Sequence, residues 1–403
     1  MHILWGILGI LFLLLVAFLF SNNKRRINWR TVLLSLFFEL LFAVLVLLWE
    51  PGRTALQWFS SLVQRVIDYA NEGIQFLFGS LIQPNNTIFA LQVLPVIIFL
   101  GALIGILYYL RVIPWIIQIV GGAVQKVLGT SRLESLSAVS TVFLGQSEAP
   151  LLIRPYVERL TQAELFQVMT SGFTSVAGST LVGYSLLGIP LPYLLAASIM
   201  TAPAALCIGK LMFPETEEPL NGAAVRMEKD VESANILDAA AAGTLSGLKL
   251  AVNVGALLLA FISVIGLING ILSGIGGLFH HPGLSLQLLL GYLFAPVAWI
   301  VGVPWSDAVT AGGFIGEKIA VNEFVAYTAF APVMPHLTAK TAVIVTFALC
   351  GFANFSSIAI QIGTFGGLAS GRRGDVARLG VKALFAGTLA NLLNAAIAGM
   401  LIH

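Results

Sequence analysis

The chain contains 403 residues, of which 58% are hydrophobic and 10% are charged, and its formal net charge is +2. The mean hydropathy is +0.93. Apolar runs of about 20 residues recur, the helix length that crosses a hydrocarbon core of roughly 30 Å. These runs exclude a soluble domain, and they exclude a β-barrel because its strands would alternate apolar and polar residues. The predicted fold class is an all-α polytopic membrane protein.

Eight apolar runs predict transmembrane helices. They lie near residues 2–20, 31–49, 87–110, 163–186, 190–212, 248–276, 341–366 and 379–402. The first run lacks a basic segment and a cleavage site, which indicates a membrane helix rather than a cleaved signal peptide. Residues 54–78 carry apolar side chains at helical spacing with polar ones opposite, which predicts an amphipathic helix in the membrane interface. A soluble extramembrane helix is the alternative.

Two segments, about 130–160 and 306–335, are too polar and too interrupted to be plain spans. Lys and Arg gather in loops on one side of the predicted helices, which predicts that these loops are cytoplasmic. The loops are 21–30, 111–135, 153–162, 210–247 and 371–378. The basic residues left on the other side are Arg53, Arg65, Lys318 and Lys340. Both termini are therefore predicted to lie outside.

Each of the two polar segments contains a carboxylate, and the surrounding pattern repeats. Glu148 lies in GQSEAP and Glu323 in VNEFVAYTAF, and each precedes a Gly-Phe pair followed by small, polar residues. Three predicted crossings separate the two units, so they enter the membrane from opposite sides. This pattern is typical of an inverted-topology repeat, in which broken helices form a site near the midplane. Chance similarity in a Gly- and Ser-rich chain is the alternative.

The polar residues of these units predict a shared cavity, since ionisable groups and irregular backbone within a membrane face partners or water. The candidates are Gln146, Ser147, Glu148, Asn322, Glu323, Asn354, Ser356 and Ser357. They include no cation, which favours a neutral, hydroxyl-rich ligand or a cation over an anion. Two carboxylates also raise the alternative of glycosidase-type chemistry. That alternative is disfavoured because these residues lie on segments predicted to be embedded in the membrane. Cys207 and Cys350 have no metal-ligand spacing.

Three motifs then indicate a family. GQSEAPLLIRPY, VNEFVAY and GFANFSSIAIQIG, in this order, closely resemble the concentrative nucleoside transporters, and KLAVNVGALLLAFI and GYLFAPVAWIVGVPW extend the likeness from about residue 90 onward. The resemblance implies the short bacterial form, a homotrimer in the cell membrane with eight helices per protomer. It also implies two re-entrant hairpins, a first hairpin at about 130–160 and a second at about 306–335, and an elevator mechanism.

The resemblance further implies an organisation into four parts. They are scaffold helices in 1–112, a first transport repeat in 113–212 with its broken helix at about 163–186, a cytoplasmic loop and long scaffold helix in 213–280, and a second transport repeat in 281–403 with its broken helix at about 341–366. The expected function is cation-coupled nucleoside import rather than catalysis, with no cofactor and no nucleic-acid partner. Symport of another neutral solute on the same fold is the alternative, and an intramembrane nucleoside hydrolase is a more distant one.

The resemblance also implies which residues bind the substrate, motif by motif. Those implied to contact the nucleobase are Gln146, Ser147, Glu148 and Thr180. Those implied to hold or line the ribose side are Glu323, Phe352, Asn354 and Ser357. An ionised carboxylate is a strong acceptor for two sugar hydroxyls, which agrees with the inventory of polar groups.

The sequence leaves two candidates for the coupling ion, H⁺ and Na⁺. Sodium ligands implied by the family are the Ser175 side chain and the carbonyls of Leu144 and Val176, but the position of a family asparagine holds Thr141. Threonine offers one oxygen on a shorter arm, so a sodium site would be weakened. Proton coupling through Glu148 or Glu323 is therefore the preferred interpretation.

One further carboxylate, Glu39, lies in the middle of the second predicted helix, in SLFFELLFAV. It is interpreted either as a proton-relay residue or as a scaffold glutamate bonded to a neighbouring helix or subunit. The second interpretation is preferred.

Overall fold

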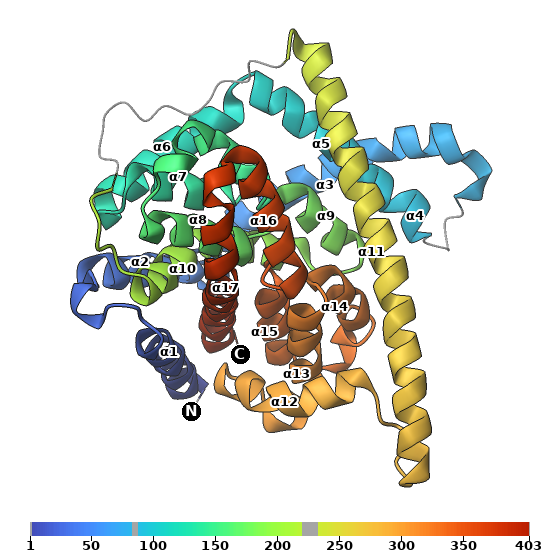
Figure 1. Cartoon of the computed structure of the whole chain (residues 1–403). Coiled ribbons are helices and arrows are strands. Elements are labelled where there is room, and N and C mark those ends of the chain that lie inside the picture. Colours follow the sequence, from blue (N-terminus) through green and yellow to red (C-terminus); the bar gives the residue numbers. More distant parts are fainter. Residues whose placement is uncertain (1, 83–87, 220–232, 403) are drawn as a thin grey trace.

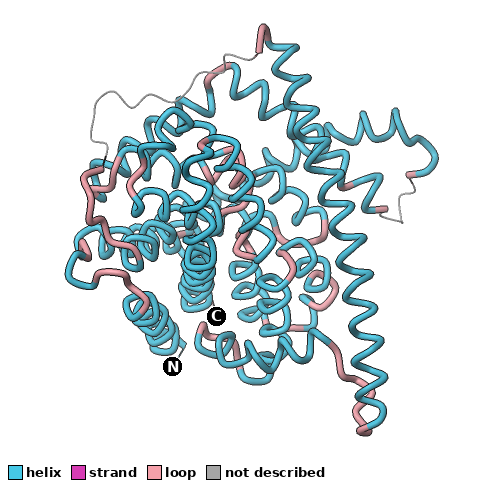
Figure 2. The backbone as a smooth tube through the Cα atoms, viewed as in Figure 1, coloured by secondary structure: helices cyan, strands magenta, loops and turns pink. Residues whose placement is uncertain are grey.

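A computed structural model describes residues 2–82, 88–219 and 233–402, and within these ranges the chain is helical and contains no strand (Figure 2). Part of the predicted charged loop at 213–236 lies outside the described residues. The N-terminal helices are α1 (His2–Leu19), α2 (Trp29–Ala43) with a π-helical turn at Val44–Leu48, α3 (Glu50–Phe78), α4 (Phe89–Gln92) and α5 (Leu94–Tyr109).

The rest of the chain forms two series of helices separated by one very long helix (Figure 1). The first series is α6 (Val112–Leu128), α7 (Arg132–Ser140), a 3-10 segment at Ala149–Arg159, α8 (Gln162–Thr174), α9 (Gly178–Leu186) and α10 (Leu191–Met212). The long helix is α11 (Ile236–Leu278). The second series is α12 (Leu286–Ile300), α13 (Trp305–Ala320), α14 (Glu323–Phe330), a 3-10 turn at Met334–His336, α15 (Ala339–Leu349), α16 (Phe355–Leu368), a 3-10 turn at Ser370–Arg372 and α17 (Arg373–Leu401).

Five helices of the described residues are long and apolar enough to span a membrane, or six if α12 and α13, which bend by 116° at their junction, form one span. The five are Trp29–Leu48, Phe89–Tyr109, Leu191–Met212, Ile236–Leu278 and Ser370–Leu401. The other three predicted spans coincide with α1, which is shorter, and with two interrupted pairs, α8–α9 and α15–α16.

The structure contains helical segments that the sequence did not predict. Residues 112–128 were predicted as part of a loop but form α6, and the apolar run 285–303, to which no element was assigned, forms α12. The long helix α11 begins at Ile236 rather than near 248, because the Asn235 side chain caps it and the Ala-rich turns that follow favour helix despite their low hydropathy.

The long helix α11 packs against α5 through glycines. A Cβ added at Gly101 would approach the Gly243 carbonyl oxygen to 2.5 Å, and one at Gly247 would approach the Ile97 carbonyl oxygen to 2.9 Å. Small residues at these positions let the two backbones touch, as in other membrane helix pairs. Larger side chains on either helix would separate them.

The two chain termini lie at the same end of the molecule (Figure 1). Gly6 near the start of α1 lies against Met400 near the end of α17, and at the opposite ends of the two helices Lys382 donates to the Asn22 side chain. The helices α1 and α17 are therefore antiparallel neighbours, which agrees with both termini being on one side.

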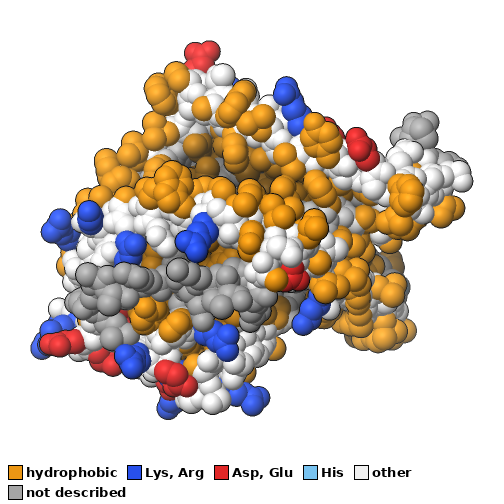
Figure 3. Space-filling view, turned by 90° about the horizontal axis from the view of Figure 1, so that it is seen from above, with side chains coloured by type: hydrophobic (Ala, Val, Ile, Leu, Met, Phe, Trp, Pro, Cys, Tyr) orange, Lys and Arg blue, Asp and Glu red, His pale blue; other side chains and the backbone are white. Residues whose placement is uncertain are grey.

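The surface of the described residues is rich in exposed apolar side chains. Leu259 is 74% exposed and Leu278 is 80% exposed on α11, and Phe76 is 89% exposed on α3. Figure 3 shows hydrophobic side chains spread over much of one face, with Lys and Arg gathered around part of it. An apolar surface of this extent is expected where lipid replaces water.

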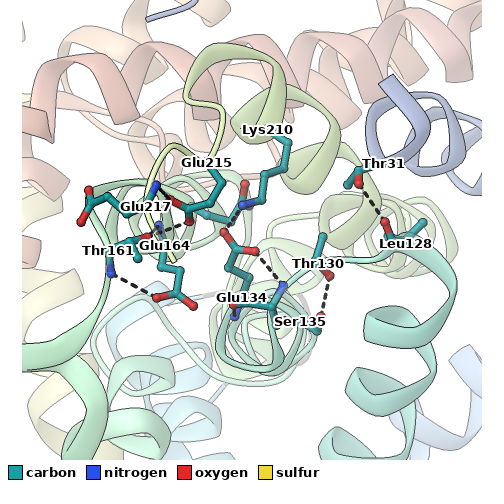
Figure 4. A network of polar contacts seen from close by, with 12 residues as sticks. Thr31, Leu128, Thr130, Glu134, Ser135, Thr161, Glu164, Lys210, Glu215 and Glu217 are labelled. Atoms are coloured by element: carbon teal, nitrogen blue, oxygen red, sulfur yellow. Dashed lines mark hydrogen bonds and ion pairs between the residues drawn. The ribbon is translucent and has the colours of Figure 1, made fainter. Parts of the chain in front are cut away.

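The base of the first hairpin is fixed by two capping boxes and an ion pair (Figure 4). At the start of α7, Ser131 and Glu134 each accept the other's backbone N–H, at 3.2 and 3.0 Å, and Thr161 and Glu164 do the same at the start of α8. Buried Lys210, at the end of α10, pairs with Glu134. The two capping boxes thus fix the first turns of α7 and α8, and the ion pair ties the start of α7 to α10.

The chain breaks its helical path between α8 and α9 (the first break) and between α15 and α16 (the second break). Both breaks lie inside the protein and bond to the side chain of Asn391. The amide nitrogen of Asn391 in α17 donates to the Thr174 carbonyl at 2.7 Å, at the end of α8, and to the Cys350 carbonyl at 3.1 Å, at the end of α15. The other end of the amide accepts from Lys318 Nζ at 2.7 Å. Helix breaks within a membrane persist only when the freed carbonyls find partners, and Asn391 supplies them for both breaks.

The position of Lys318 corrects its predicted placement. It was counted among the basic residues outside the membrane, but it is 1% exposed, and its ammonium group donates to the Ala348 carbonyl at 2.9 Å as well as to Asn391. Because a buried lysine contributes nothing to the charge of a loop, Lys318 carries no information about orientation.

The contact between Asn391 and the second break leads to a prediction about Gly351. A Cβ at Gly351 would lie 2.3 Å from the Asn391 side-chain oxygen and 2.5 Å from the Thr174 carbonyl oxygen. Gly351→Ala is expected to destabilise the protein by about 1–3 kcal/mol, the usual range for overpacking. The measurement is thermal unfolding in detergent.

Gly363→Ala is the matched control, because no atom lies within 4 Å of a Cβ there and Gly363 is in the interior of α16. It should leave the unfolding temperature unchanged or raise it slightly. Equal unfolding temperatures for the two variants would contradict the close contact at Asn391.

Candidate functional site

The site lies where the two hairpins and the two broken helix pairs meet. The Phe352 N–H donates to the Ser175 carbonyl at 3.1 Å, which links the second break to the first. The Gly178 N–H donates to the Phe143 carbonyl at 3.3 Å, which links the first break to the tip of the first hairpin. These backbone bonds bring three irregular segments together, although they are far apart in the sequence.

The Glu323 carboxylate is 5% exposed and receives a hydrogen bond on each of its oxygens. The Asn354 amide donates to one oxygen at 2.8 Å, and the Tyr184 hydroxyl donates to the other at 3.1 Å. Glu323 begins α14, immediately after Asn322, whose side chain caps that helix by accepting from the Val325 N–H at 2.9 Å. Cap and donors together fix the orientation of the carboxylate.

Asn354 faces Glu323 because it also caps α16. Its side-chain oxygen accepts from the Ser357 N–H at 2.9 Å and from the Ser356 hydroxyl at 2.7 Å. With the oxygen occupied in this way, the amide nitrogen is left to donate to the carboxylate. The residues predicted on the second break and on the second hairpin are thus in direct contact.

The first hairpin reaches the same region through Gln146. Its amide donates to the Ser357 hydroxyl at 2.8 Å, and its oxygen accepts from Gln361 of α16 at 3.3 Å. Gln361 also donates to the Met169 carbonyl at 3.1 Å. A Cβ at Gly172 would lie 2.9 Å from the Gln361 amide nitrogen, so this glycine makes room for the contact.

Glu148 and Ser147 are more exposed than Gln146. Glu148 accepts from the Gly145 N–H at 3.0 Å and lines a cavity of about 600 Å³ together with Leu144 and Ser179. The other walls come from α5 and from the first part of α11. In the described part of the chain, the Glu148 side chain therefore faces a cavity with both polar and apolar lining residues and makes no hydrogen bond to the group around Glu323.

Thr180 and Phe352 have different surroundings. Thr180 is 2% exposed and its hydroxyl has no hydrogen-bond partner among the described residues, whereas Phe352 is half-buried. Thr180 lies one helical turn before Tyr184, on the same side of α9 as the donor to Glu323. Its free hydroxyl is available to a ligand.

The predicted ion-binding residues lie on two segments that touch. Thr141 and Leu144 are at the tip of the first hairpin, Ser175 and Val176 are in the first break, and all four are buried. The Thr141 hydroxyl donates to the Ala138 carbonyl at 2.9 Å, while the Ser175 hydroxyl has no hydrogen-bond partner among the described residues. The segments are joined by the bond from Gly178 to Phe143 described above.

Four residues of the site were missed from the sequence. Tyr184 and Gln361 bond to predicted residues, Asn391 bridges the breaks, and Lys318 donates to Asn391. A lysine five positions before Glu323 in an apolar stretch was the signal available; the other three residues carry no sequence signal of their own.

Comparison with known proteins places this geometry in a family. Models described as the "Na+ dependent nucleoside transporter" N-terminus and C-terminus match residues 8–81 and 193–399, and one described as "Nucleoside recognition" matches residues 90–205. The chain is 54% identical to an uncharacterised transporter, YutK, of Bacillus subtilis, with all of both chains covered. It is 45% identical to the nucleoside permease NupC of Helicobacter pylori, over 99% of this chain and 98% of that protein.

A solved structure extends the likeness to three dimensions. The inward-facing, substrate-bound structure of CNTnw superposes with a TM-score of 0.94 at 46% identity and covers 100% of this chain and 98% of that one. Structures of CNTnw variants in outward-facing states superpose with TM-scores of 0.95 and 0.96. The chain therefore belongs to the concentrative nucleoside transporter family.

Proposed function

We propose that this protein imports nucleosides across the cytoplasmic membrane by coupling their entry to a cation gradient, and that Glu323 binds the ribose. The observation that carries this proposal is the carboxylate fixed by Tyr184 and Asn354 at the junction of the second hairpin with the second break. A carboxylate held in one orientation is a strong acceptor for two neighbouring hydroxyls. A ligand without those hydroxyls would leave it incompletely paired.

The nucleobase binds, in this proposal, to the first hairpin and α9. Gln146, Ser147, Glu148 and Thr180 provide amide, hydroxyl and carboxylate groups, and Phe352 provides an apolar surface. The bond between Gln146 and Ser357 supports a continuous site, because it joins a base residue directly to a ribose residue. A nucleoside entering the site would replace this bond with its own polar groups.

The proposed architecture is a homotrimer of protomers with eight crossings and two re-entrant hairpins arranged as an inverted repeat. The first three spans and α11 form the scaffold, and the two repeats move as an elevator. The antiparallel packing of α1 and α17 supports termini on one side, which the distribution of Lys and Arg predicts to be the outside. The shared Asn391 supports treating both breaks as one moving unit.

The coupling cation is proposed to be a proton. Thr141 presents one hydroxyl oxygen on a shorter arm than the asparagine found at this position in the family, so a sodium ion there would be held more weakly. Glu148 or Glu323 is the group proposed to take up the proton. Sodium is the second candidate, favoured by the family descriptions and by the unpartnered hydroxyl of Ser175.

Glu323→Gln is expected to abolish nucleoside uptake while leaving the trimer assembled. Hydrogen bonds to a charged group contribute about 1.5–3 kcal/mol each, so the loss of two lowers affinity by well over tenfold. The measurement is uptake of radiolabelled uridine and adenosine into proteoliposomes, with chromatography of the trapped label. Label recovered as free base and ribose would instead support the hydrolase alternative.

Glu72→Gln is the matched control for the same chemical change, because Glu72 is exposed on α3. It should transport at the rate of the unmodified protein. Normal uptake by the Glu323 variant would contradict the assignment of the ribose site.

A second experiment imposes the two gradients separately. A proton gradient alone should drive nucleoside accumulation in the unmodified protein, and a sodium gradient alone should not. Thr141→Asn is expected to introduce a dependence on sodium, because the longer amide side chain brings a carbonyl oxygen toward Ser175. A sodium requirement in the unmodified protein would show that Thr141 and Ser175 already hold the ion and would overturn proton coupling.

A further inference from the structure

The carboxyl group of Glu39 lies inside the protomer, far from the hairpins in sequence and on a different helix. One side of α2 is buried, and its members follow a helical spacing: Val32, Ser35, Glu39 and Ala43. This side of α2 packs against α10. Glu39 is 0% exposed, so its side chain is enclosed within a single chain and no second subunit can reach it.

Glu39 has no hydrogen-bond partner on either oxygen among the described residues. The hydroxyl of Ser35, one turn earlier on the same side of the helix and also 0% exposed, has none either. The interpretation preferred from the sequence, a glutamate bonded to a neighbouring helix or subunit, is therefore wrong for the described part of the chain. A buried polar group without a hydrogen-bond partner is uncommon in proteins and calls for a physical explanation.

The elements around Glu39 offer it no cation. On α10, the one charged residue is Lys210, which is already paired with Glu134. On α6, the one charged residue, Lys126, is exposed, and the turn Val44–Leu48 has none. The charged residues of α17 lie in its first turns, where Lys382 donates to Asn22 and the others are Arg373, Asp375 and Arg378.

Among the described residues, a cavity next to α2 is lined by apolar side chains. A cavity of about 330 Å³ lies between α2, α6 and α10, and its lining includes Phe38 and Phe42 on either side of Glu39 and Leu206 beside Cys207. An apolar cavity of this kind supplies no oxygen or nitrogen to a carboxylate and does not hold ordered water. An ionised Glu39 would therefore be a charge without a partner or a solvent shell.

We propose that Glu39 is a proton-binding site, occupied by a proton as a neutral carboxylic acid in the interface between α2 and α10. An isolated carboxylate in an apolar interior is so unfavourable that the group takes up a proton instead. The same holds for a carboxylate in the middle of a membrane helix without a partner. The ligand of this site is the proton, and the site is separate from the carboxylates proposed to couple transport.

The proposal has a mechanical consequence for the α2–α10 interface. While Glu39 is neutral, the two helices pack closely along the buried side of α2. Loss of the proton would place a charge in that contact and would require water or a cation to enter between the helices. The interface is thus stable when the site is occupied and weakens when alkaline conditions remove the proton.

The first test compares unfolding of the unmodified protein with that of Glu39→Gln, in detergent, at a series of pH values. Glutamine keeps the shape of the neutral acid but has no proton to release. An unfolded chain releases that proton above about pH 4.3, so the unfolding equilibrium constant of the unmodified protein should rise relative to the variant by up to about tenfold per pH unit. A ratio that does not change with pH would overturn the proposal.

Glu72→Gln is the control for this series, because Glu72 is exposed on α3 and the ratio of this variant to the unmodified protein should stay flat. Sodium is added at the alkaline end in a parallel arm. A sodium-dependent stabilisation of the unmodified protein that Glu39→Gln lacks would overturn the proton and identify a cation as the ligand.

A second test needs no variant and therefore does not depend on folding of Glu39→Gln. Hydrophobic carbodiimides react with protonated carboxyl groups in apolar surroundings, and mass spectrometry of the digested protein locates the adduct. Glu39 should be modified, with labelling that falls as pH rises, and the exposed Glu72 in the same digest should not be. Absence of labelling at Glu39 over the whole pH range in native protein would overturn the assignment.

Discussion

The geometry of the site depends on one amide, that of Asn391. A chain that interrupts two helices within a membrane exposes carbonyls that lipid cannot satisfy, and these must be bonded inside the protein. The amide nitrogen of Asn391 donates to one carbonyl in each break. Lys318 donates to the amide oxygen and so keeps the amide nitrogen directed at the two carbonyls. The two breaks cannot move apart without losing these bonds, so α17 holds the two breaks together.

The residues proposed to bind the substrate are also oriented by the helix breaks. Asn354 is directed at Glu323 because it caps the helix that follows the second break, and Gln146 meets Ser357 because Gly172 leaves room for Gln361. Helix capping and close backbone packing therefore set the positions of groups whose chemistry is polar. The same dependence on close packing underlies the expected loss of stability in Gly351→Ala.

The sequence allowed the broken segments and their carboxylates to be predicted, because Glu148, Glu323 and Asn354 are polar residues in an apolar background. It did not allow Tyr184, Gln361 or Asn391 to be predicted, since their importance comes from partners distant along the chain. The helix α6 and the first turns of α11 were missed for a different reason. Their composition is amphipathic or rich in small residues, and a search for continuous apolar runs does not detect either pattern.

The length of α11 bears on the cavity that the first hairpin faces. At 1.5 Å per residue its 43 residues extend about 65 Å, whereas a bilayer with its headgroups is about 40–45 Å thick. Its apolar portion begins near residue 248, so the preceding turns project beyond the hydrocarbon on one side. Asp238 and Ser246 of those turns line the cavity that Glu148 also faces. The extra length of α11 thus forms part of the wall of the cavity that the first hairpin faces.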